Sequence, residues 1–562
     1  MRWTIKPVPA LEKIKHLQDA LQVDAVTAQL LIQRGIKTYD DAKAFFRPSI
    51  SQLHDPFLMK DMDRAVDRIE KAIKSGENIL IYGDYDVDGT TAVSLMYSFL
   101  SKIHSSVATY IPDRYEEGYG ISYQGIDFAQ DNGFTLIIAL DCGIKAIDKV
   151  AYAEEKQIDF IICDHHRPGE HLPKAVAVLD PKRKDCTYPY EELCGCGVGF
   201  KLIQALAQHQ DVPVEALTEY LDLVATAIGA DIVPITGENR ILAYHGLEVI
   251  NKNPRPGIAA MTAPLKKELT ITDVVFIIAP RINAAGRIKH GQNAVNLLTE
   301  NDPNVAIAFA EEIETFNLDR RSLDKQITAE ALAQITTLKE EDRMTSVVYD
   351  KSWHKGVIGI VASRLIETYY RPTLVFTKSG NKLAASARSV RGYDVYEALE
   401  ACQEHIEQFG GHKYAAGLTL AEANYGAFKQ KFEEVVSGNI DPKLLVPEIS
   451  IDAEIKLRDL TPKFYRILKQ FAPFGPGNMR PTFMVSKAQD TGYGKTVGQT
   501  NDHLKLTLTQ DKVRIGAIGF NLGDKEDLIK DKQCFSAAFT LDENEWNGNV
   551  TLQLKLKDIK PN

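Results

Sequence analysis

Three short apolar runs, each ending in an aspartate, constrain the fold more than any other feature of the sequence. They are "NILIYGD" (78–84), "FTLIIALD" (134–141) and "DFIICD" (159–164). The segments between them carry apolar residues at helical spacing, and strands that alternate with helices indicate a doubly wound α/β fold with a parallel sheet. In such a sheet ligands bind at the carboxyl ends of the strands, so these aspartates are expected to converge on one crevice.

Further acids and two histidines follow these strand ends. The first run continues as "GDYDVDGT", in which Asp84, Asp86 and Asp88 alternate, and an extended segment would place all three on one side. The third run continues with the pair His165 and His166. Carboxylates crowded in a cleft stay ionised only when a cation compensates them, and oxygen and imidazole ligands favour Mn²⁺ or Mg²⁺. Two such ions about 3.5–4 Å apart would clamp a phosphodiester.

A further acid, Asp231 in "ATAIGADIVP", follows an apolar helix and is a candidate ligand from outside the sheet. Each acid also has a simpler interpretation, because an aspartate after a strand is commonly a helix N-cap, and Asp88 before "GTTA" fits that role. "DYDVDG" resembles the start of a calcium-binding EF-hand loop, but the twelfth position is Leu95 rather than Glu, which excludes calcium. "CGC" (194–196) fits either a zinc site or small buried residues in a turn.

The length of 562 residues requires several hydrophobic cores. The patterns predict an N-terminal helical segment (1–60), an α/β domain that carries the acids (61–240), a helical connector (241–338), a smaller α/β domain (339–437) and an all-β domain of sandwich or barrel type (446–562). The last of these is predicted from the strict alternation in "HLKLTLTQ" and "VTLQLKLKD" and from the hairpin signal Asn547-Gly548.

Composition limits the cellular setting. No apolar run is long enough for a signal sequence or a membrane span, and seven cysteines do not form an evident disulfide pattern, so we expect a cytoplasmic protein without membrane contact. The net charge of −10 argues against a broadly basic coat but leaves room for a local nucleic-acid groove.

The motifs resemble those of a known family. "GDYDVDGTTA", "ALDCGI", "CDHHRPG" and "ATAIGADIVP" are similar to the successive motifs of the DHH phosphoesterase superfamily. "GVGFKL", "PRINAAGRI", "HKGVIGIVASRL", "FGGHKYAAGLTL" and "FAPFGPGNMRPTF" extend the resemblance to the RecJ family of single-strand-specific exonucleases, over essentially the whole chain. The resemblance implies a DHH domain, a DHH-associated C-terminal domain and an oligonucleotide-binding (OB-like) barrel.

The resemblance also implies an activity and the residues that carry it. The activity is metal-dependent 5′→3′ hydrolysis of single-stranded DNA with two Mn²⁺ or Mg²⁺ ions, in DNA repair and recombination. The implied metal ligands are Asp84, Asp86, Asp141, His165 and Asp231. The implied catalytic residues are His166 at the phosphate or the attacking water, Asp164 as an orienting acid, and Asp88.

A basic pocket for the 5′ end is implied as well, together with contacts to the DNA backbone. The implied substrate-binding residues are Arg114, Arg281, Ser386, Arg388, Gly410, Gly411 and His412. Arginine suits phosphate because its guanidinium offers a two-pronged donor. The expected partners of a monomer are single-stranded DNA, a single-strand-binding protein and a helicase.

Two alternatives remain from the sequence. One is a DHH phosphodiesterase that acts on short oligonucleotides or dinucleotides, against which the extra β domain counts. The other is a DNA-binding scaffold with a decayed site, against which the intact set of acids and histidines counts. The face of the barrel that contacts DNA stays undetermined.

Overall fold

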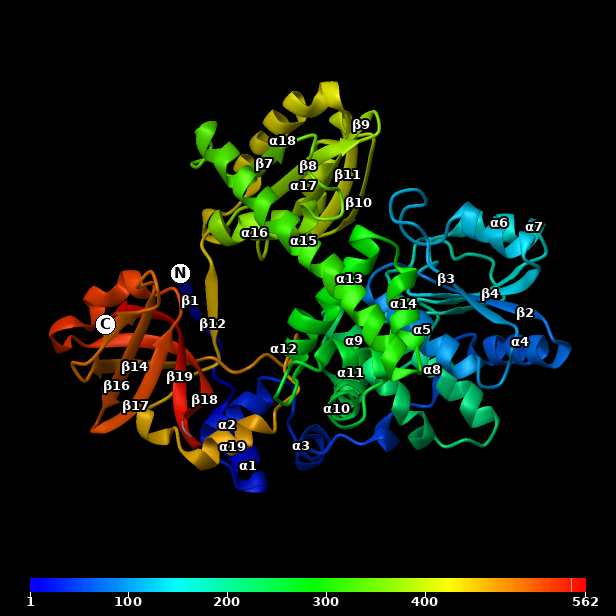
Figure 1. Ribbon diagram of the computed structural model, residues 1–562. Coiled ribbons are helices and arrows are strands. Elements are labelled where there is room, and N and C mark those ends of the chain that lie inside the picture. The colour runs from blue at the N-terminus through cyan, green and yellow to red at the C-terminus, as the bar shows by residue number, and fades with distance from the viewer. Residues whose placement is uncertain (547) are drawn as a thin grey trace. The chain divides into compact units, whose positions relative to one another are not determined.

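The structure is a computed structural model that describes residues 1–546 and 548–562 (Figure 1). Asn547, the first residue of the predicted hairpin turn, lies outside the described residues. The chain forms two compact units. The first unit holds residues 1–2, 287–289 and 312–448, and the second holds 3–286, 290–311 and 449–562. No helix in the described part of the chain combines the length and apolar character that crossing a membrane requires.

The second unit contains the predicted parallel sheet. Its strands are β2 (Asn78–Gly83), β3 (Val107–Tyr110), β4 (Phe134–Leu140), β5 (Asp159–Cys163) and β6 (Ala177–Leu179). They lie in the order β3-β2-β4-β5-β6 and every neighbouring pair is parallel. The doubly wound fold is therefore confirmed, while the edge strands β3 and β6 are additions that the sequence pattern did not predict.

Helices cover both faces of this sheet. Alternate residues such as Leu80 and Ile137 pack with Ile126 of α6 (Tyr123–Asp131) and Val150 of α7 (Ile147–Glu155). The other face is covered by α5 (Val87–Leu100) and α8 (Gly195–His209). Because both faces are buried, the strands are continuously apolar rather than alternating.

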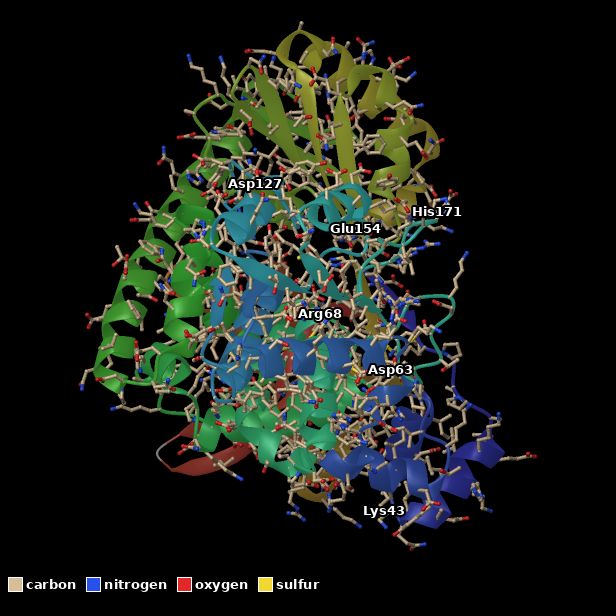
Figure 2. All side chains as sticks on the ribbon, turned by 90° about the vertical axis from the view of Figure 1, so that its right-hand side faces the viewer. Lys43, Asp63, Arg68, Asp127, Glu154 and His171 are labelled. Carbon is tan, nitrogen blue, oxygen red and sulfur yellow. The ribbon has the colours of Figure 1, made fainter. Side chains whose placement is uncertain are left out.

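The strand order fixes where a ligand can bind. From β2 the chain passes to β3 on one side and then to β4 on the other, so the crevice at the carboxyl ends opens between β2 and β4. The amino end is held by α4 (Met62–Ser75), whose Arg68 donates to Asp159 at 2.6 Å and to Glu77 at 2.7 Å (Figure 2). The sheet is thus fixed at one end and open to ligands at the other.

A helical layer continues the second unit. It consists of α9 (Leu221–Ala230), α10 (Gly237–Lys252), α11 (Pro256–Thr262), α12 (Ile271–Asp273), the π-helix η4 (Val274–Ile278), α13 (Ala279–Ile288) and α14 (Gln292–Thr299). The long helix α15 (Pro303–Thr337) follows, and from residue 312 on it belongs to the first unit. This agrees with the helical pattern predicted after residue 240.

The C-terminal part of the second unit is a closed barrel. Its strands are β14 (Phe483–Asp490), β15 (Lys495–Val497), β16 (His503–Gln510), β17 (Val513–Gly519), β18 (Phe535–Trp546) and β19 (Asn549–Pro561). The order is β13-β14-β18-β19-β17-β16-β15, with β13 at Ala453–Glu454, and the additional pairing of β14 with β16 closes the barrel. β17 and β19 are parallel while the other pairs among β14 to β19 are antiparallel, and Trp546 of β18 pairs with Asn549 of β19.

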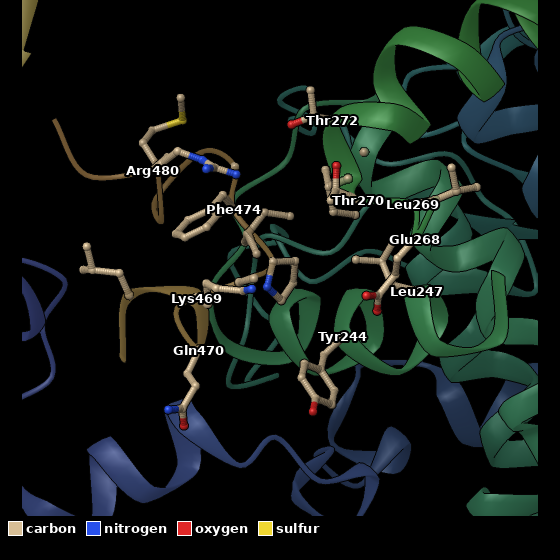
Figure 3. A pocket seen from close by; sticks show the side chains of 18 of the residues that line it. Tyr244, Leu247, Glu268, Leu269, Thr270, Thr272, Lys469, Gln470, Phe474 and Arg480 are labelled. Atoms are coloured by element: carbon tan, nitrogen blue, oxygen red, sulfur yellow. The ribbon is translucent and has the colours of Figure 1, made fainter. Parts of the chain in front are cut away.

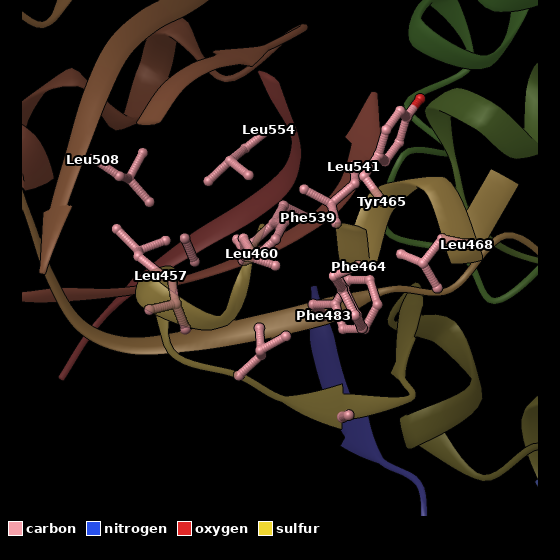
Figure 4. Packing of buried hydrophobic residues seen from close by; sticks show 14 of the residues in the cluster. Leu457, Leu460, Phe464, Tyr465, Leu468, Phe483, Leu508, Phe539, Leu541 and Leu554 are labelled. Carbon is pink, nitrogen blue, oxygen red and sulfur yellow. The ribbon is translucent and has the colours of Figure 1, made fainter. Parts of the chain in front are cut away.

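The N-terminal helices pack on this barrel although they are far away in sequence. Leu17 of α1 (Leu11–Leu21) and Leu31 of α2 (Ala25–Ile32) share one buried cluster with Phe464, Phe483 and Phe539 (Figures 1 and 4). The barrel part of this cluster is drawn in Figure 4. The two ends of the chain therefore fold into one hydrophobic core.

Arg240 on α10 joins the helical layer to this core. Its guanidinium is buried, stacks 3.8 Å from the Phe45 ring centroid, and donates to the backbone carbonyls of Phe45, Phe471 and Ala472 at 2.8–3.1 Å. Because carbonyl groups satisfy the cation, its position is fixed by backbone from both chain ends.

The first unit is the smaller α/β domain that was predicted. Its strands are β7 (Ser346–Tyr349), β8 (Thr373–Ser379), β9 (Lys382–Arg388), β10 (Gln408–His412) and β11 (Ala415–Ala421), in the order β10-β11-β9-β8-β7. Its shorter helices are α16 (Ile358–Thr368), α17 (Val395–Glu400) and α18 (Tyr425–Asn439). Phe376, Phe428 and Phe432 are fully buried in its core.

Candidate metal centre

Three buried aspartates lie at the carboxyl ends of adjacent parallel strands. Asp84 follows β2, Asp141 follows β4 and Asp164 follows β5, and none is more than 1% exposed. Asp141 has a φ of 59°, a left-handed conformation that aspartate tolerates better than most residues. The switch between β2 and β4 thus places one carboxylate on each side of the crevice, Asp84 after β2 and Asp141 after β4.

His165 is the centre of a ring of carboxylates. Its Nε2 lies 3.2 Å from Asp141 Oδ1, 3.6 Å from Asp231 Oδ2 and 3.7 Å from Asp88 Oδ2. Neighbouring ligand atoms around one octahedral ion with bonds of 2.0–2.1 Å lie about 3 Å apart. These atoms are therefore close enough together to share a cation, and Asp231, which follows α9, joins the strand-end residues from outside the sheet.

The two histidines are held differently. Asp164 Oδ1 accepts hydrogen bonds from His166 Nδ1 at 2.7 Å and from the His165 backbone N–H at 2.8 Å, while Oδ2 accepts from the Ile144 N–H at 2.9 Å. Asp164 therefore orients the His166 ring rather than that of His165. The His166 ring is 44% exposed, and its Nε2 lies 3.3 Å from the Tyr119 hydroxyl.

The pKa values of the carboxyl groups show how crowded the negative charge is. Burial, and then the charge of Asp86, raise the pKa of Asp84 well above its usual range and that of Asp88 to about 7. Burial, and then the charge of Asp88, raise the pKa of Asp141 and bring that of Asp231 to about 8. Without a compensating cation these groups cannot all be ionised at neutral pH.

The histidines and Asp164 shift in ways that fit their contacts. Burial, and then the charge of His166, lower the pKa of His165 to about 3, so its imidazole is neutral and can act as a metal ligand. Burial disfavours the charged forms of both His166 and Asp164, but the hydrogen bond between the two side chains favours these forms and outweighs the effect of burial. The pKa of His166 rises to about 9 and that of Asp164 falls to about 2.

Two carboxylate oxygens at this site have no hydrogen-bond donor, and they show whether a metal ion would fit between the residues. Asp84 Oδ2 and Asp141 Oδ1 are buried and accept no hydrogen bond, although Asp141 Oδ1 lies beside His165 Nε2. Buried carboxylate oxygens that lack donors are costly unless a cation binds them. The oxygen-rich donor set with one neutral imidazole fits Mn²⁺ or Mg²⁺.

The motif aspartates do not lie on one extended segment, and that prediction is wrong because α5 begins at Val87. Asp86 is the N-cap of α5 and accepts from the Gly89 N–H at 3.0 Å. Asp88, in the first turn of α5, accepts from the N–H groups of Gly195 at 2.6 Å and Cys196 at 2.7 Å. Both Asp88 oxygens therefore hold the start of α8, while Oδ2 still faces His165.

Gly195 was not predicted, although the site requires it. A Cβ atom at this position would lie 2.5 Å from Asp141 Cβ and 2.6 Å from Asp141 Oδ1. Only glycine lets the start of α8 approach the carboxylate this closely. The available signal was the small-residue run "CGCGVG" (194–199), which starts α8 with Cys194 as its N-cap and whose zinc interpretation has no support from these contacts.

Arg114 lies next to the carboxylates on an aromatic platform. Its guanidinium carbon is 3.9 Å from the Tyr85 ring centroid, and its Nε donates to the Gly286 carbonyl at 3.1 Å. Tyr119 packs edge-on against both Tyr85 and His166, with centroid separations of 6.0 and 6.2 Å. The sequence did not predict Tyr85 or Tyr119 as part of the site. Tyr119 lies between two glycines with positive φ in "GYG".

Arg281, on α13, donates to the Ile277 carbonyl at 2.7 Å.

Ser386 and Arg388 lie together in the first unit. They are on β9, where Arg388 Nη1 donates to Ser386 Oγ at 3.0 Å, and both contact the first turn of α16. A Cβ on Gly359 would lie 2.9 Å from Arg388 Nη2 and 2.9 Å from Ser386 Oγ. A guanidinium, a hydroxyl and the N-terminus of a helix all favour an anion.

Gly410, Gly411 and His412 lie on β10, the edge strand of that sheet, and are exposed. Gly411 has a φ of 143°, and a Cβ there would lie 2.4 Å from the Ala415 carbonyl oxygen. Gly410 has open space around its Cα. The requirement for glycine is therefore steric at Gly411 and absent at Gly410.

Comparison with known protein families gives three matches along the chain. The DHH family, N-terminal domain, matches residues 78–228, the DHHA1 domain matches residues 342–438, and the RecJ OB domain matches residues 451–558. The first match contains every aspartate and histidine of the metal-centre set except Asp231.

Similar proteins and structures extend over the whole chain. The single-stranded-DNA-specific exonuclease RecJ of Bacillus subtilis is 36% identical over 99% of this chain and 70% of its own length. The crystal structure of RecJ from Thermus thermophilus in complex with Mn²⁺ has a TM-score of 0.86 and 27% identity, covering 100% of this chain and 80% of that one. The Mg²⁺ complex of the Thermus thermophilus protein has a TM-score of 0.80 and 26% identity, over 100% and 79% of the two chains.

Proposed function

The chain belongs to the RecJ family of DHH exonucleases, and we propose that it is a metal-dependent exonuclease that degrades single-stranded DNA from the 5′ end. The observation that carries this proposal is the ring of Asp88, Asp141 and Asp231 oxygens within 3.2–3.7 Å of His165 Nε2. Asp88, Asp141 and His165 of this ring are buried at the switch point of a parallel sheet, which has little use in a scaffold, because their uncompensated charge would cost stability.

We propose that two Mn²⁺ or Mg²⁺ ions bind here. Asp84 and Asp141 would hold one ion, and Asp86, Asp141, His165 and Asp231 the other. When bound, such ions lower the pKa of water and neutralise charge that develops on the phosphate. The two buried oxygens that lack donors, Asp84 Oδ2 and Asp141 Oδ1, are the atoms that support this assignment.

The surrounding residues would position the phosphodiester. Asp164 fixes the half-exposed His166 ring through Nδ1, and Nε2, which lies 3.3 Å from the Tyr119 hydroxyl, would face a phosphate oxygen or the attacking water. Arg114 is held on Tyr85 and by the Gly286 carbonyl, so its remaining N–H groups are oriented before substrate arrives. Asp88 acts on this site as a positioning residue, because it holds the start of α8 against Asp141.

The 5′→3′ direction rests on the resemblance together with the anion site of the first unit. Arg388 and Ser386 beside the first turn of α16 would bind a terminal 5′-phosphate, and Gly411 and His412 on the exposed edge strand would contact the DNA backbone. Arg281 is proposed as a further backbone contact. We also propose the domain limits that the sequence predicts.

The decisive test uses end-labelled DNA with Mn²⁺. The protein should release label from the 5′ end of single-stranded DNA before the 3′ end, leave duplex DNA intact, and lose at least about a hundredfold in rate as Asp141→Ala. Equal rates for Asp141→Ala would exclude the metal mechanism, and tight binding without cleavage would support a scaffold. Preference for dinucleotides would support the alternative phosphodiesterase.

End recognition can be tested separately. Arg388→Ala should slow cleavage of 5′-phosphorylated strands about tenfold or more while changing 5′-hydroxyl strands little, because one charge-assisted interaction is lost. Arg364→Ala is the matched control, since this arginine is on α16 but pairs with Glu367 at the surface. Equal losses on both ends would remove Arg388 from the phosphate pocket.

We also propose that the protein acts as a monomer in the cytoplasm, in DNA repair and recombination, beside a single-strand-binding protein and a helicase. The support is the family resemblance, and sedimentation of the purified protein tests the monomer. A helicase would supply the single strands that such an enzyme consumes.

A further inference from the structure

Asp231 is the proposed metal ligand that no strand of the parallel sheet carries into the site. It is the C-terminal cap residue of α9, and its N–H donates to the Ala227 carbonyl at 2.9 Å. Its side chain is 33% exposed, and apart from His165, whose Nε2 lies 3.6 Å from Asp231 Oδ2, no described residue pairs with the carboxylate. The position of this ligand therefore depends on the backbone that follows it.

The backbone after Asp231 bends sharply between α9 and α10. Ile232 has a φ of 60°, which a β-branched residue rarely adopts, and Gly237 at the start of α10 has a φ of 44°. Such backbone conformations persist only where surrounding contacts determine them. The loop 232–236 therefore needs partners outside itself, and its buried residue Ile235 shows where they lie.

One partner is a turn near the other end of the chain. This turn, residues 475–478, follows α19 (Pro462–Lys469) and leads into the barrel, and we call it the Gly475 turn. The Ile235 N–H donates to the Pro476 carbonyl at 2.7 Å, and a Cβ atom on Gly475 would lie 2.5 Å from Ile235 Cγ1. Both segments line the groove that Figure 3 shows. The loop and the turn therefore touch without room for one added carbon atom.

The Gly475 turn is itself held firmly. Its backbone closes on itself, because Gly475 and Asn478 exchange N–H to carbonyl hydrogen bonds at 3.1 and 2.9 Å. The buried Asn478 side chain donates to the carbonyls of Phe471 and Pro473 at 2.7 and 2.9 Å. Its Oδ1 accepts from Arg34 Nε at 2.8 Å, and Arg34 lies just after α2. The turn is therefore a rigid support rather than a flexible connection.

The loop is also held from the side of the parallel-sheet domain. The Tyr190 hydroxyl donates to the Pro234 carbonyl at 3.3 Å and lies 3.0 Å from Thr236 Oγ1. Asn239 Nδ2 donates to the same Pro234 carbonyl at 3.0 Å. The loop after Asp231 is therefore clamped between these residues and the Gly475 turn.

We infer that the Gly475 turn is a positioning element for Asp231, and through Asp231 for the second metal ion, the one assigned above to Asp86, Asp141, His165 and Asp231. Loss of the contact with Ile235 would let the Asp231 carboxylate move away from His165 while the parallel sheet stays folded. Residues that orient a metal ligand commonly change metal affinity by about 10–100-fold. This inference rests on the proposed nuclease function and adds to it a dependence of metal binding on a turn that belongs to the barrel side of the chain.

Calorimetric titration of the whole chain with Mn²⁺, in the absence of DNA, tests the inference. The unmodified protein should bind two ions. Gly475→Ala should bind one ion as before and the second about 10–100-fold more weakly, because the added Cβ displaces Ile235. Gly516→Ala is the matched control, since Gly516 lies on β17 of the barrel with open space around it, and its titration should equal that of the unmodified protein.

A second substitution separates positioning from general damage. Ile235→Ala removes the Cγ1 atom that the added Cβ would meet, so the double variant Gly475→Ala/Ile235→Ala should regain most of its affinity for the second ion. Gly475→Ala should also recover its cleavage rate at high Mn²⁺ concentration, which a misfolded protein would not do.

Unchanged binding of both ions by Gly475→Ala, or no recovery in the double variant, would overturn the inference. If Gly475→Ala does not fold, Tyr190→Phe loosens the same loop from its other side and should weaken the second ion severalfold. Unchanged Mn²⁺ binding by Tyr190→Phe would then overturn the inference. If the unmodified protein binds no Mn²⁺, the proposed function itself is wrong.

Discussion

Replacing Asp88 and Asp141 by asparagine should change the stability of the metal-free protein in opposite directions. Both residues are buried in the same cluster, and asparagine keeps their shape. Asp88 accepts two short hydrogen bonds, from the N–H groups of Gly195 at 2.6 Å and Cys196 at 2.7 Å. In Asp88→Asn the side chain would offer one oxygen and one NH₂, so one buried N–H would lose its acceptor at a cost of about 1–3 kcal/mol.

Burial and a neighbouring carboxylate raise the pKa of Asp141 as they do that of Asp88, but no hydrogen bond to Asp141 Oδ1 offsets them. Burial and the charge of Asp88 therefore oppose its ionisation. An asparagine in its place would remove that charge and could donate to a neighbouring carboxylate, and asparagine also tolerates the left-handed φ of 59° at this position. We therefore expect Asp141→Asn to stabilise the metal-free protein by about 1–3 kcal/mol.

Thermal denaturation in EDTA and in Mn²⁺ checks this prediction. The second unit holds about 420 residues, and at about 2.1 cal/mol/K per residue 1 kcal/mol corresponds to about 1 °C, so Asp88→Asn should melt about 1–3 °C lower in EDTA and Asp141→Asn about 1–3 °C higher. Mn²⁺ at a hundredfold excess over its Kd should add about 2.7 kcal/mol to the unmodified protein and much less to Asp141→Asn. Equal destabilisation of both variants in EDTA would refute the argument that Asp141 lacks a partner until a cation binds.

Three further variants test the packing that supports the site. Gly195→Ala should lower the cleavage rate at least about a hundredfold, because its Cβ would lie 2.5 Å from Asp141 Cβ, and an unchanged rate would show that α8 can shift. Arg240→Met should destabilise the protein by about 3–5 kcal/mol, measured by urea unfolding, because several backbone carbonyls lose a buried cationic donor. Gly411→Ala should reduce activity on DNA while the neighbouring Gly410→Ala does not, since only the former meets a carbonyl oxygen, at 2.4 Å, and similar effects of both would contradict the steric argument.

The sequence predicted the doubly wound sheet and the position of the acids within it. This was possible because buried parallel strands are continuous apolar runs, and their last residues must lie at one edge of the sheet. Asp84, Asp141 and Asp164 were located by this argument alone. The short strands β3 and β6 escaped it, since three or four residues give too little periodicity to detect.

The different tasks of similar residues within the site were decided by tertiary structure. Asp88 faces the N–H groups of residues more than a hundred positions away, so no local pattern could show that it holds α8. Asp164 and His166 are close in sequence, yet the hydrogen bond between them depends on the turn after β5. The packing of the N-terminal helices on the C-terminal barrel is likewise invisible to periodicity, because an amphipathic helix shows that it has an apolar face but does not show which surface covers it.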